Sequence, residues 1–189
     1  MIRRLTDFNM YVAIAGFREA KISDVNRFFR SPLKEISNAT TVQFFDAQFI
    51  ATWQHLYFAA LNALTAFANK TNISKSLAVE TLLFASAQRQ IRKATSMMGI
   101  TPKTSEVAVL IIGENKKTIL NTLKNIQKIL SAKRDDGVLE IHPEKITKIK
   151  QFFNVSAEEF SAKLEKKGFE NCALVDLVIE HVALLAIQR

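Results

Sequence analysis

Hydrophobic residues recur along this chain in short runs typical of strands and in longer runs typical of helices. Residues 9–15, 41–45 and 107–112 are short runs rich in β-branched or aromatic side chains, and we expect each to be a strand. Gly16 would close the first, and the third is apolar at every position, so it should be buried on both faces. Because only five glycines and three prolines occur, we expect long elements and short loops.

Two successive helices in the first half are predicted to be apolar on nearly every side. Residues 53–68 form the first, and residues 74–98 form a second that we expect to be continuous and to end at Gly99, apolar in its first half and polar in its second. A helix that is hydrophobic all round has to be buried in a core or against a partner. The pair therefore predicts a central helical hairpin.

Further helices follow with recognisable start signals. Residues 24–30 form a short helix, residues 116–130 are amphipathic, another helix follows Pro143, and the string S-A-E-E from Ser156 is a capping box. Strands separated by helices, with more helix towards the C-terminal end, predict a mixed α/β (α+β) fold. We expect residues 1–189 to form a single domain, in which a small mixed β-sheet packs against several helices, including the hairpin and a C-terminal helix.

Composition and cysteine content narrow the possible classes of protein. The chain is 48% hydrophobic and 23% charged, which are ordinary globular proportions. No apolar run reaches the roughly 18 residues of a membrane span, and the first residues lack the apolar stretch of a secretory signal, so we expect a cytoplasmic protein without membrane contact. The sole cysteine, Cys172, excludes an internal disulfide and a cysteine-based metal site; as it precedes an apolar helix, we expect it to be buried.

No standard catalytic or cofactor motif is present. The glycine-rich phosphate-binding motifs GxGxxG and GxxxxGK are absent, as are HExxH and GxSxG. The three histidines, His55, His142 and His181, lie on separate predicted elements. Paired acids occur at 135–136, within a predicted turn, and at 158–159, where the capping box explains them. We therefore expect a protein that is not an enzyme and that holds neither a cofactor nor a metal.

The net charge of +8 is concentrated in one part of the chain. Residues 70–134 hold twelve lysines and arginines against three acids, whereas the remainder is nearly balanced. This asymmetry favours a polyanionic partner, and the alternative is a solvated face made mostly of lysines.

Within that region, a basic cluster occupies the polar half of the helix predicted at 74–98. On one continuous helix, Lys75, Ser86, Arg89 and Lys93 would fall within about 60° of one another. Such a surface can hold phosphates, and the alternative is a solvated last turn that complements the helix dipole. The candidate nucleic-acid-binding residues are Lys75, Arg89, Gln90, Arg92 and Lys93.

Three polar residues interrupt the apolar helices of the hairpin. His55 and Asn62 are seven residues apart on one face, and Glu80 lies in the second helix. Buried polar groups need partners, so a structural network that fixes helix packing is the favoured interpretation, with an RNA-contacting role as the alternative.

The last helix has a wider apolar arc than a surface helix requires. Leu184 and Ile187 lie outside its predicted core stripe, which suggests a surface for a partner; deep docking onto the rest of the domain is the alternative. The stripe consists of Leu174, Leu177, Val178, His181, Val182 and Leu185.

Six segments of this chain, in order, resemble the kinase-binding subunit of the KEOPS tRNA-modification complex, the PRPK-binding protein family. The most specific string is Gln-Arg-Gln-Ile at 88–91. Two positions depart from the family pattern, which more often has glycine where Ala87 stands and arginine where His181 stands. The segments are YVAIAGFR (11–18), VQFFDAQFIA (42–51), HLYFAALNALTAF (55–67), SKSLAVETLLFASAQRQIRKA (74–94), VAVLIIG (107–113) and LVIEHVALLA (177–186).

The resemblance implies an accessory subunit of the complex that makes threonylcarbamoyladenosine in tRNA. It implies direct binding and stimulation of the small atypical kinase subunit, and indirect association with the transferase and the small dimerising subunits. For an archaeal member, which this chain resembles, it also implies binding of the 3′ CCA end of tRNA. The basic cluster would then contact tRNA, and His181, Leu184 and Ile187 would contact the kinase. The alternatives are a free-standing RNA-binding protein, a scaffold that binds protein only, and a small enzyme.

Overall fold

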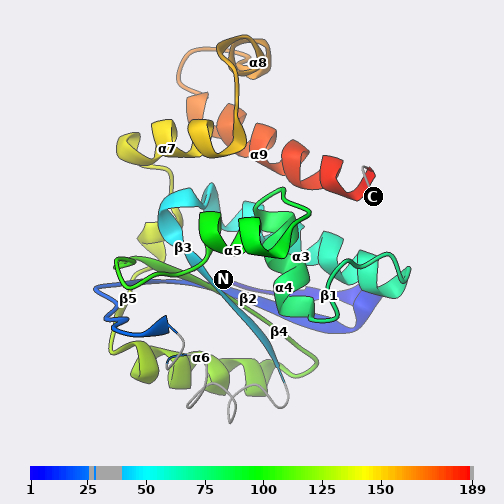
Figure 1. Ribbon diagram of the computed structural model, residues 1–189, viewed down its shortest axis with the longest axis vertical. Helices are drawn as coiled ribbons and strands as arrows, with labels where there is room; N and C mark the ends of the chain where they lie inside the picture. Colours follow the sequence, from blue (N-terminus) through cyan, green and yellow to red (C-terminus); the bar gives the residue numbers. More distant parts are fainter. Residues whose placement is uncertain (26–27, 29–39, 188–189) are drawn as a thin grey trace.

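Helices cover both faces of a five-stranded sheet in the computed structural model, which describes residues 1–25, 28 and 40–187 (Figure 1). Helix α6 lies on one face, α3 and α4 lie on the other, and α9 packs over α3 (Figure 1). The helix expected at 24–30 falls mostly outside the described residues.

The elements have bounds close to those expected from the sequence for most of the chain. The strands are β1 (Ile2–Leu5), β2 (Met10–Arg18), β3 (Thr41–Asp46), β4 (Val107–Gly113) and β5 (Lys133–Arg134). The α-helices are α3 (Thr52–Ala68), α4 (Leu77–Ala85), α5 (Ile91–Met98), α6 (Lys116–Leu130), α7 (Pro143–Phe153), α8 (Ala157–Lys163) and α9 (Glu170–Ile187).

The sheet has the order β1-β2-β4-β3, with β5 pairing to the end of β2. The mixed α/β class is confirmed, but every described strand pairing is antiparallel, whereas we expected a mixed sheet. The sequence of β4 is apolar at every position, as is typical of parallel sheets, because helices bury both faces of this antiparallel strand. Alternate residues divide between the two cores: Leu110 joins the one that includes Leu56 of α3, and Val109 joins the one that includes Ile119 of α6.

Gly16 does not end β2, as the sequence suggested, but lies inside it. A Cβ atom at this position would come within 2.5 Å of the Asp135 carbonyl oxygen and of the Val138 side chain. Glycine is therefore required because the chain after β5 passes close to β2, and the strand continues to Arg18.

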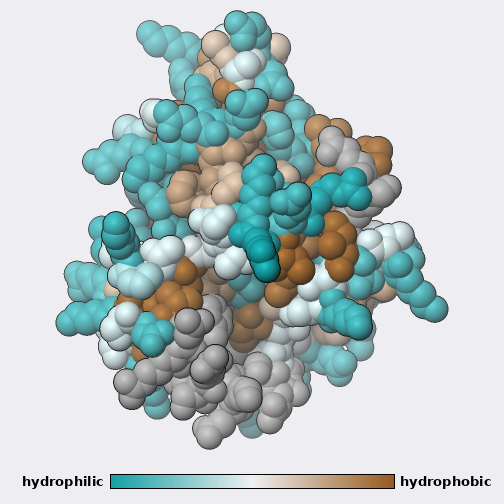
Figure 2. All heavy atoms as spheres, in the orientation of Figure 1, coloured by the Kyte–Doolittle hydropathy of each residue, from teal (hydrophilic) through white to brown (hydrophobic). Residues whose placement is uncertain are grey.

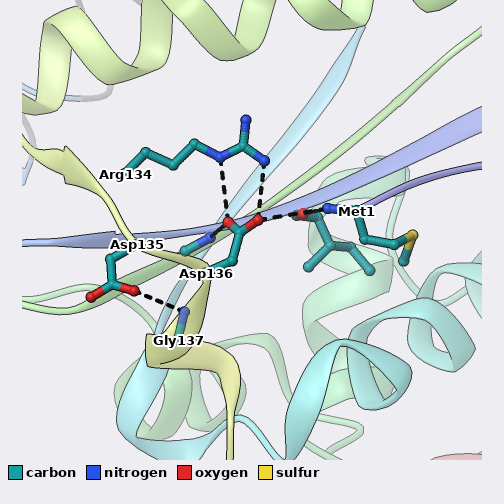
Figure 3. Close-up of polar contacts among 7 residues, drawn as sticks. Met1, Arg134, Asp135, Asp136 and Gly137 are labelled. Carbon is teal, nitrogen blue, oxygen red and sulfur yellow. Dashed lines mark hydrogen bonds and ion pairs between the residues drawn. The ribbon is translucent and has the colours of Figure 1, made fainter.

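The turn after β5 is held by its two acidic residues (Figure 3). Asp136 accepts a hydrogen bond from the Gly16 amide at 3.0 Å, and it pairs with Arg134 at 3.1 Å and with the Met1 amine at 3.9 Å. Burial alone would raise the pKa of Asp136, but the hydrogen bonds from Arg134 and Gly16 outweigh it and lower that pKa. Asp135 accepts from the Gly137 amide at 2.9 Å. This acid pair therefore has a structural role.

The C-terminal helices follow the expected pattern, with one correction. The capping box at Ser156 is present and begins α8. Cys172 is exposed rather than buried, because the first turns of α9 face the core with Ala173 and Leu174 instead.

Candidate functional site

The helix expected at 74–98 is broken between Ala85 and Ile91, and this break builds the candidate site. Ala87 has a φ of 50°, and its amide donates to the Phe84 carbonyl while the Gln88 amide donates to the Leu83 carbonyl. This pair of bonds is a Schellman motif, which ends α4. Neither glycine nor proline lies at the break in this chain, and the signal that could have located it is the resemblance, which implies glycine more often where Ala87 stands.

A histidine from the neighbouring helix explains why α4 stops here. His55 is fully buried; its Nε2 donates to the Ala85 carbonyl at 2.7 Å, and its Nδ1 accepts from the Ala51 amide at 3.3 Å. In a continuous helix, the Ala85 carbonyl would accept from the Arg89 amide instead. Burial lowers the pKa of His55 to about 4, so the ring is neutral and its two nitrogens are both satisfied.

The other two polar residues of the hairpin are also structural. The Glu80 carboxylate is fully buried and accepts from the amides of Ile73, at 3.1 Å, and Ser74, at 2.8 Å, which fixes the loop before α4. Asn62 donates to the Phe58 carbonyl within its own helix at 2.9 Å. Of these contacts, the bond from His55 joins the two helices, as the favoured sequence interpretation expected, whereas those of Glu80 and Asn62 fix a loop and lie within α3.

The break also changes the arrangement of the basic cluster. Lys75 precedes α4 and Arg89 follows it, so the length of a nine-residue helix, about 14 Å, separates them along its axis. Ser86 is buried, and its hydroxyl donates back to the Leu82 carbonyl at 2.8 Å. The expectation of one stripe within 60° is therefore wrong, because it assumed a continuous helix.

What remains is a compact basic surface at the N-terminus of α5, which we call the α5 cluster: Arg89, Gln90, Arg92 and Lys93, all exposed. The first backbone hydrogen bond of α5 joins the Ala94 amide to the Gln90 carbonyl, and the Gln90 side chain makes no capping bond. The preceding amides thus point out of the helix end, where the dipole favours an anion. Ala94 and Met98 are fully buried and anchor the helix.

An exposed hydrophobic side chain, Ile91, lies within this basic surface and is 43% exposed. Ile91 is not among the contact residues predicted from the sequence, because on a continuous helix it would lie on the side away from the basic residues. An apolar side chain between cations can pack against a base or a ribose while the cations hold phosphates.

A second candidate surface lies at the C-terminal end of α9, where hydrophobic residues gather (Figure 2). Leu184 is 47% exposed and Ile187 is 79% exposed, although Val178 and Val182 on the opposite side of the helix are fully buried. His181 is half-buried, with its ring 6.0 Å from that of Phe153. We call Leu184 and Ile187, with His181 at their border, the α9 surface.

The predicted residues thus form two surfaces and one outlier. The α5 cluster and the α9 surface belong to different elements, and Lys75 lies at the far end of α4 from the α5 cluster. Among the residues that the structure describes, no three His, Cys, Asp or Glu side chains lie close enough to share a metal ion. Within the same residues, no helix has the length and apolar character needed to cross a membrane.

Comparison with known proteins relates this chain to a family and to a curated relative. The family model described as "Kinase binding protein CGI-121" matches residues 21–186. The "Regulatory protein Cgi121" of Methanocaldococcus jannaschii is 30% identical over 176 residues, which covers 93% of this chain and 98% of that relative.

Proposed function

The chain belongs to the CGI-121 family of kinase-binding proteins, and from this premise we propose that it is an accessory subunit of the KEOPS complex that docks on the kinase subunit and binds tRNA. Two exposed surfaces of the fold support this proposal. The α9 surface is suited to a protein, and the α5 cluster is suited to a nucleic acid. The transferase and the small dimerising subunits would then be reached through the kinase.

Docking of the kinase is assigned to the α9 surface. Leu184 and Ile187 leave a large apolar area in water on a helix whose other side already fills the core. Exposed apolar side chains that adjoin one another at a helix end are typical of a contact with a partner. The observation that carries this assignment is the 79% exposure of Ile187, since the fold itself makes almost no use of this side chain.

The test is copurification of the kinase subunit with the Ile187→Glu variant. A charge that becomes buried without a partner at an interface costs several kcal/mol, and a loss of about 3 kcal/mol weakens binding more than a hundredfold. In the isolated subunit the charge stays in water, so the melting temperature should not change. Leu120→Glu is a matched control, because Leu120 is 38% exposed on α6, on the opposite face of the sheet. Full kinase binding by Ile187→Glu would move the docking surface elsewhere.

Binding of tRNA is assigned to the α5 cluster. Three cationic side chains and an amide side chain lie within residues 89–93, at the N-terminus of α5 with its backbone amides, and this combination suits phosphate groups. Ile91 offers an apolar contact for an unpaired base. A single-stranded end fits this small surface better than a duplex does, which agrees with the 3′ CCA end as its ligand.

The assignment is tested by measuring the affinity for tRNA with and without its CCA tail. Loss of the tail should weaken binding at least tenfold, which corresponds to about 1.4 kcal/mol. Arg92→Ala and Lys93→Ala should each weaken binding of the intact tRNA while circular dichroism shows a folded protein. Lys75→Ala should have a smaller effect, because Lys75 lies away from the cluster. Equal affinity for the tailless tRNA would refute the assignment.

We further propose that the protein acts as one domain in the cytoplasm and performs no chemistry itself. The CGI-121 relative is called a regulatory protein, and the acid pair and His55 described above have structural partners. ATP turnover that stays with the purified chain, free of the kinase, would contradict this. Kinase binding without tRNA binding would favour a protein-only scaffold, and the reverse would favour a free-standing RNA-binding protein.

A further inference from the structure

Helix α6 carries a positively charged surface that belongs to neither the α5 cluster nor the α9 surface. Its fifteen residues include four lysines and no acidic residue. Ile119 and Ile126 are fully buried on its inner side, so the helix is fixed to the sheet. Its outer side presents a row that we call the α6 stripe. The stripe consists of Lys117, Asn121, Lys124 and Lys128, spaced by four, three and four residues, and all four are exposed.

The surface beside the stripe is hollowed and lined by hydrogen-bond donors. The hollow has a volume of about 740 Å³, and its lining includes Asn121, Lys124, Asn125, Gln127 and Lys128. Among the described residues, no carboxylate lies within ion-pair distance of the three stripe lysines. The positive charge of the stripe is therefore not neutralised by the described part of the protein.

We infer that the α6 stripe binds the sugar-phosphate backbone of double-helical RNA. Lys117 and Lys128 are eleven residues apart, so the stripe is about 16 Å long and can meet several phosphates of one strand. The amides of Asn121, Asn125 and Gln127 can hydrogen-bond phosphate oxygens or ribose hydroxyls. Lysine is depleted from protein–protein interfaces, so this composition favours a nucleic acid over an acidic protein.

The inference rests on the proposed binding of tRNA and assigns a different part of that RNA to a different surface. The α5 cluster would hold the unpaired end, and the α6 stripe would hold a base-paired arm. Since α6 and α9 lie on opposite sides of the sheet, a partner docked on α9 leaves the stripe open (Figure 1).

The test compares two ligands with a variant in which Lys117, Lys124 and Lys128 are all replaced by Gln. Glutamine and lysine have similar helix propensities, so the fold should be kept, and this is checked by the melting temperature. The variant should bind whole tRNA at least tenfold more weakly. The slope of log affinity against log salt should decrease by about 2 to 3 for three lost phosphate contacts. Affinity for a short single-stranded RNA ending in CCA should not change.

A matched control removes three exposed lysines from the C-terminal helical region: Lys148, Lys166 and Lys167, each replaced by Gln. An equal loss in this control would overturn the inference in favour of general charge. Unchanged tRNA affinity of the stripe variant would also overturn the inference. The proposed function would still stand in that case, because the wild-type protein would bind tRNA. Weaker binding of the short RNA would place the unpaired end on α6 and overturn the division between the two surfaces. If the wild-type protein bound no tRNA, the proposed function would fail and the inference with it.

Discussion

Acidification should destabilise this protein through His55, which holds the end of α4. The ring is fully buried, with one nitrogen donating to the Ala85 carbonyl and the other accepting from the Ala51 amide. A second ring proton would point at the Ala51 amide, which is itself a donor. Protonation therefore breaks a hydrogen bond and places an unpaired charge in the core.

The size of the effect follows from the two pKa values of this residue. The pKa of His55 is about 4 in the folded protein and 6.5 in the unfolded chain. Between these values the unfolded chain binds a proton that the folded protein does not, so stability is lost as the pH falls from 6.5 towards 4. The loss is about 2 kcal/mol at pH 5 and about 3 kcal/mol below pH 4.

Urea unfolding of the wild type and of His55→Gln at pH 7.5 and pH 5.0 isolates this contribution. Glutamine keeps an N–H donor for the Ala85 carbonyl but does not titrate, and every other ionisable side chain is the same in both proteins. The free energy of unfolding of the wild type should fall by about 2 kcal/mol more than that of the variant.

The same acid dependence in both proteins would refute the reasoning. The wild type also allows a direct check by NMR: the ring protons of His55 should not shift between pH 8 and pH 5.5. A ring that titrates in that range would show that the site admits a proton without unfolding.

Three further predictions concern single positions. Ala87→Gly should raise the free energy of unfolding, measured by heat or urea, by about 0.5 to 1 kcal/mol. The reason is that relief of the left-handed strain at a φ of 50° exceeds the entropy cost of glycine. Ala87→Val should lower the free energy of unfolding. Glu80→Gln should lower the free energy of unfolding by about 2 to 3 kcal/mol, because the amides of Ile73 and Ser74 lose a charged acceptor in a fully buried site. An unchanged urea midpoint would count against this role of Glu80. Cys172 should react with a thiol reagent in the native protein nearly as fast as in the unfolded chain, and slow native reaction would contradict its exposure.

The elements that were predicted from the sequence are those whose signals are local. The apolar run of β4, the amphipathic stripe of α6 and the capping box at Ser156 each depend on residues near one another in the chain. Strand β1 was missed because two of its four residues are arginines, and it forms by pairing with β2 at the edge of the sheet.

The features that were predicted wrongly depend on contacts distant in sequence. Gly16 looked like a strand end because the close approach of Asp135 is not visible in the local sequence. The end of α4 depends on the hydrogen bond from His55, thirty residues before Ala85. This chain has neither glycine nor proline at the break to indicate it. The sequence therefore identified most residues of the exposed basic surface at the start of α5, but not their arrangement.

His55 also connects the two surfaces assigned under the proposed function. It lies on α3, its ring is 5.5 Å from that of Phe153, and Phe153 in turn contacts His181 of α9. Its bond to Ala85 fixes the point from which the chain leaves α4 towards Arg89. A change at an exposed side chain such as Ile187 should affect one surface only, since it alters no contact in this chain of packed residues. A change at His55 should weaken both, because it acts on the core that positions them. Comparing the two kinds of variant therefore separates loss of a contact from loss of the framework that presents it.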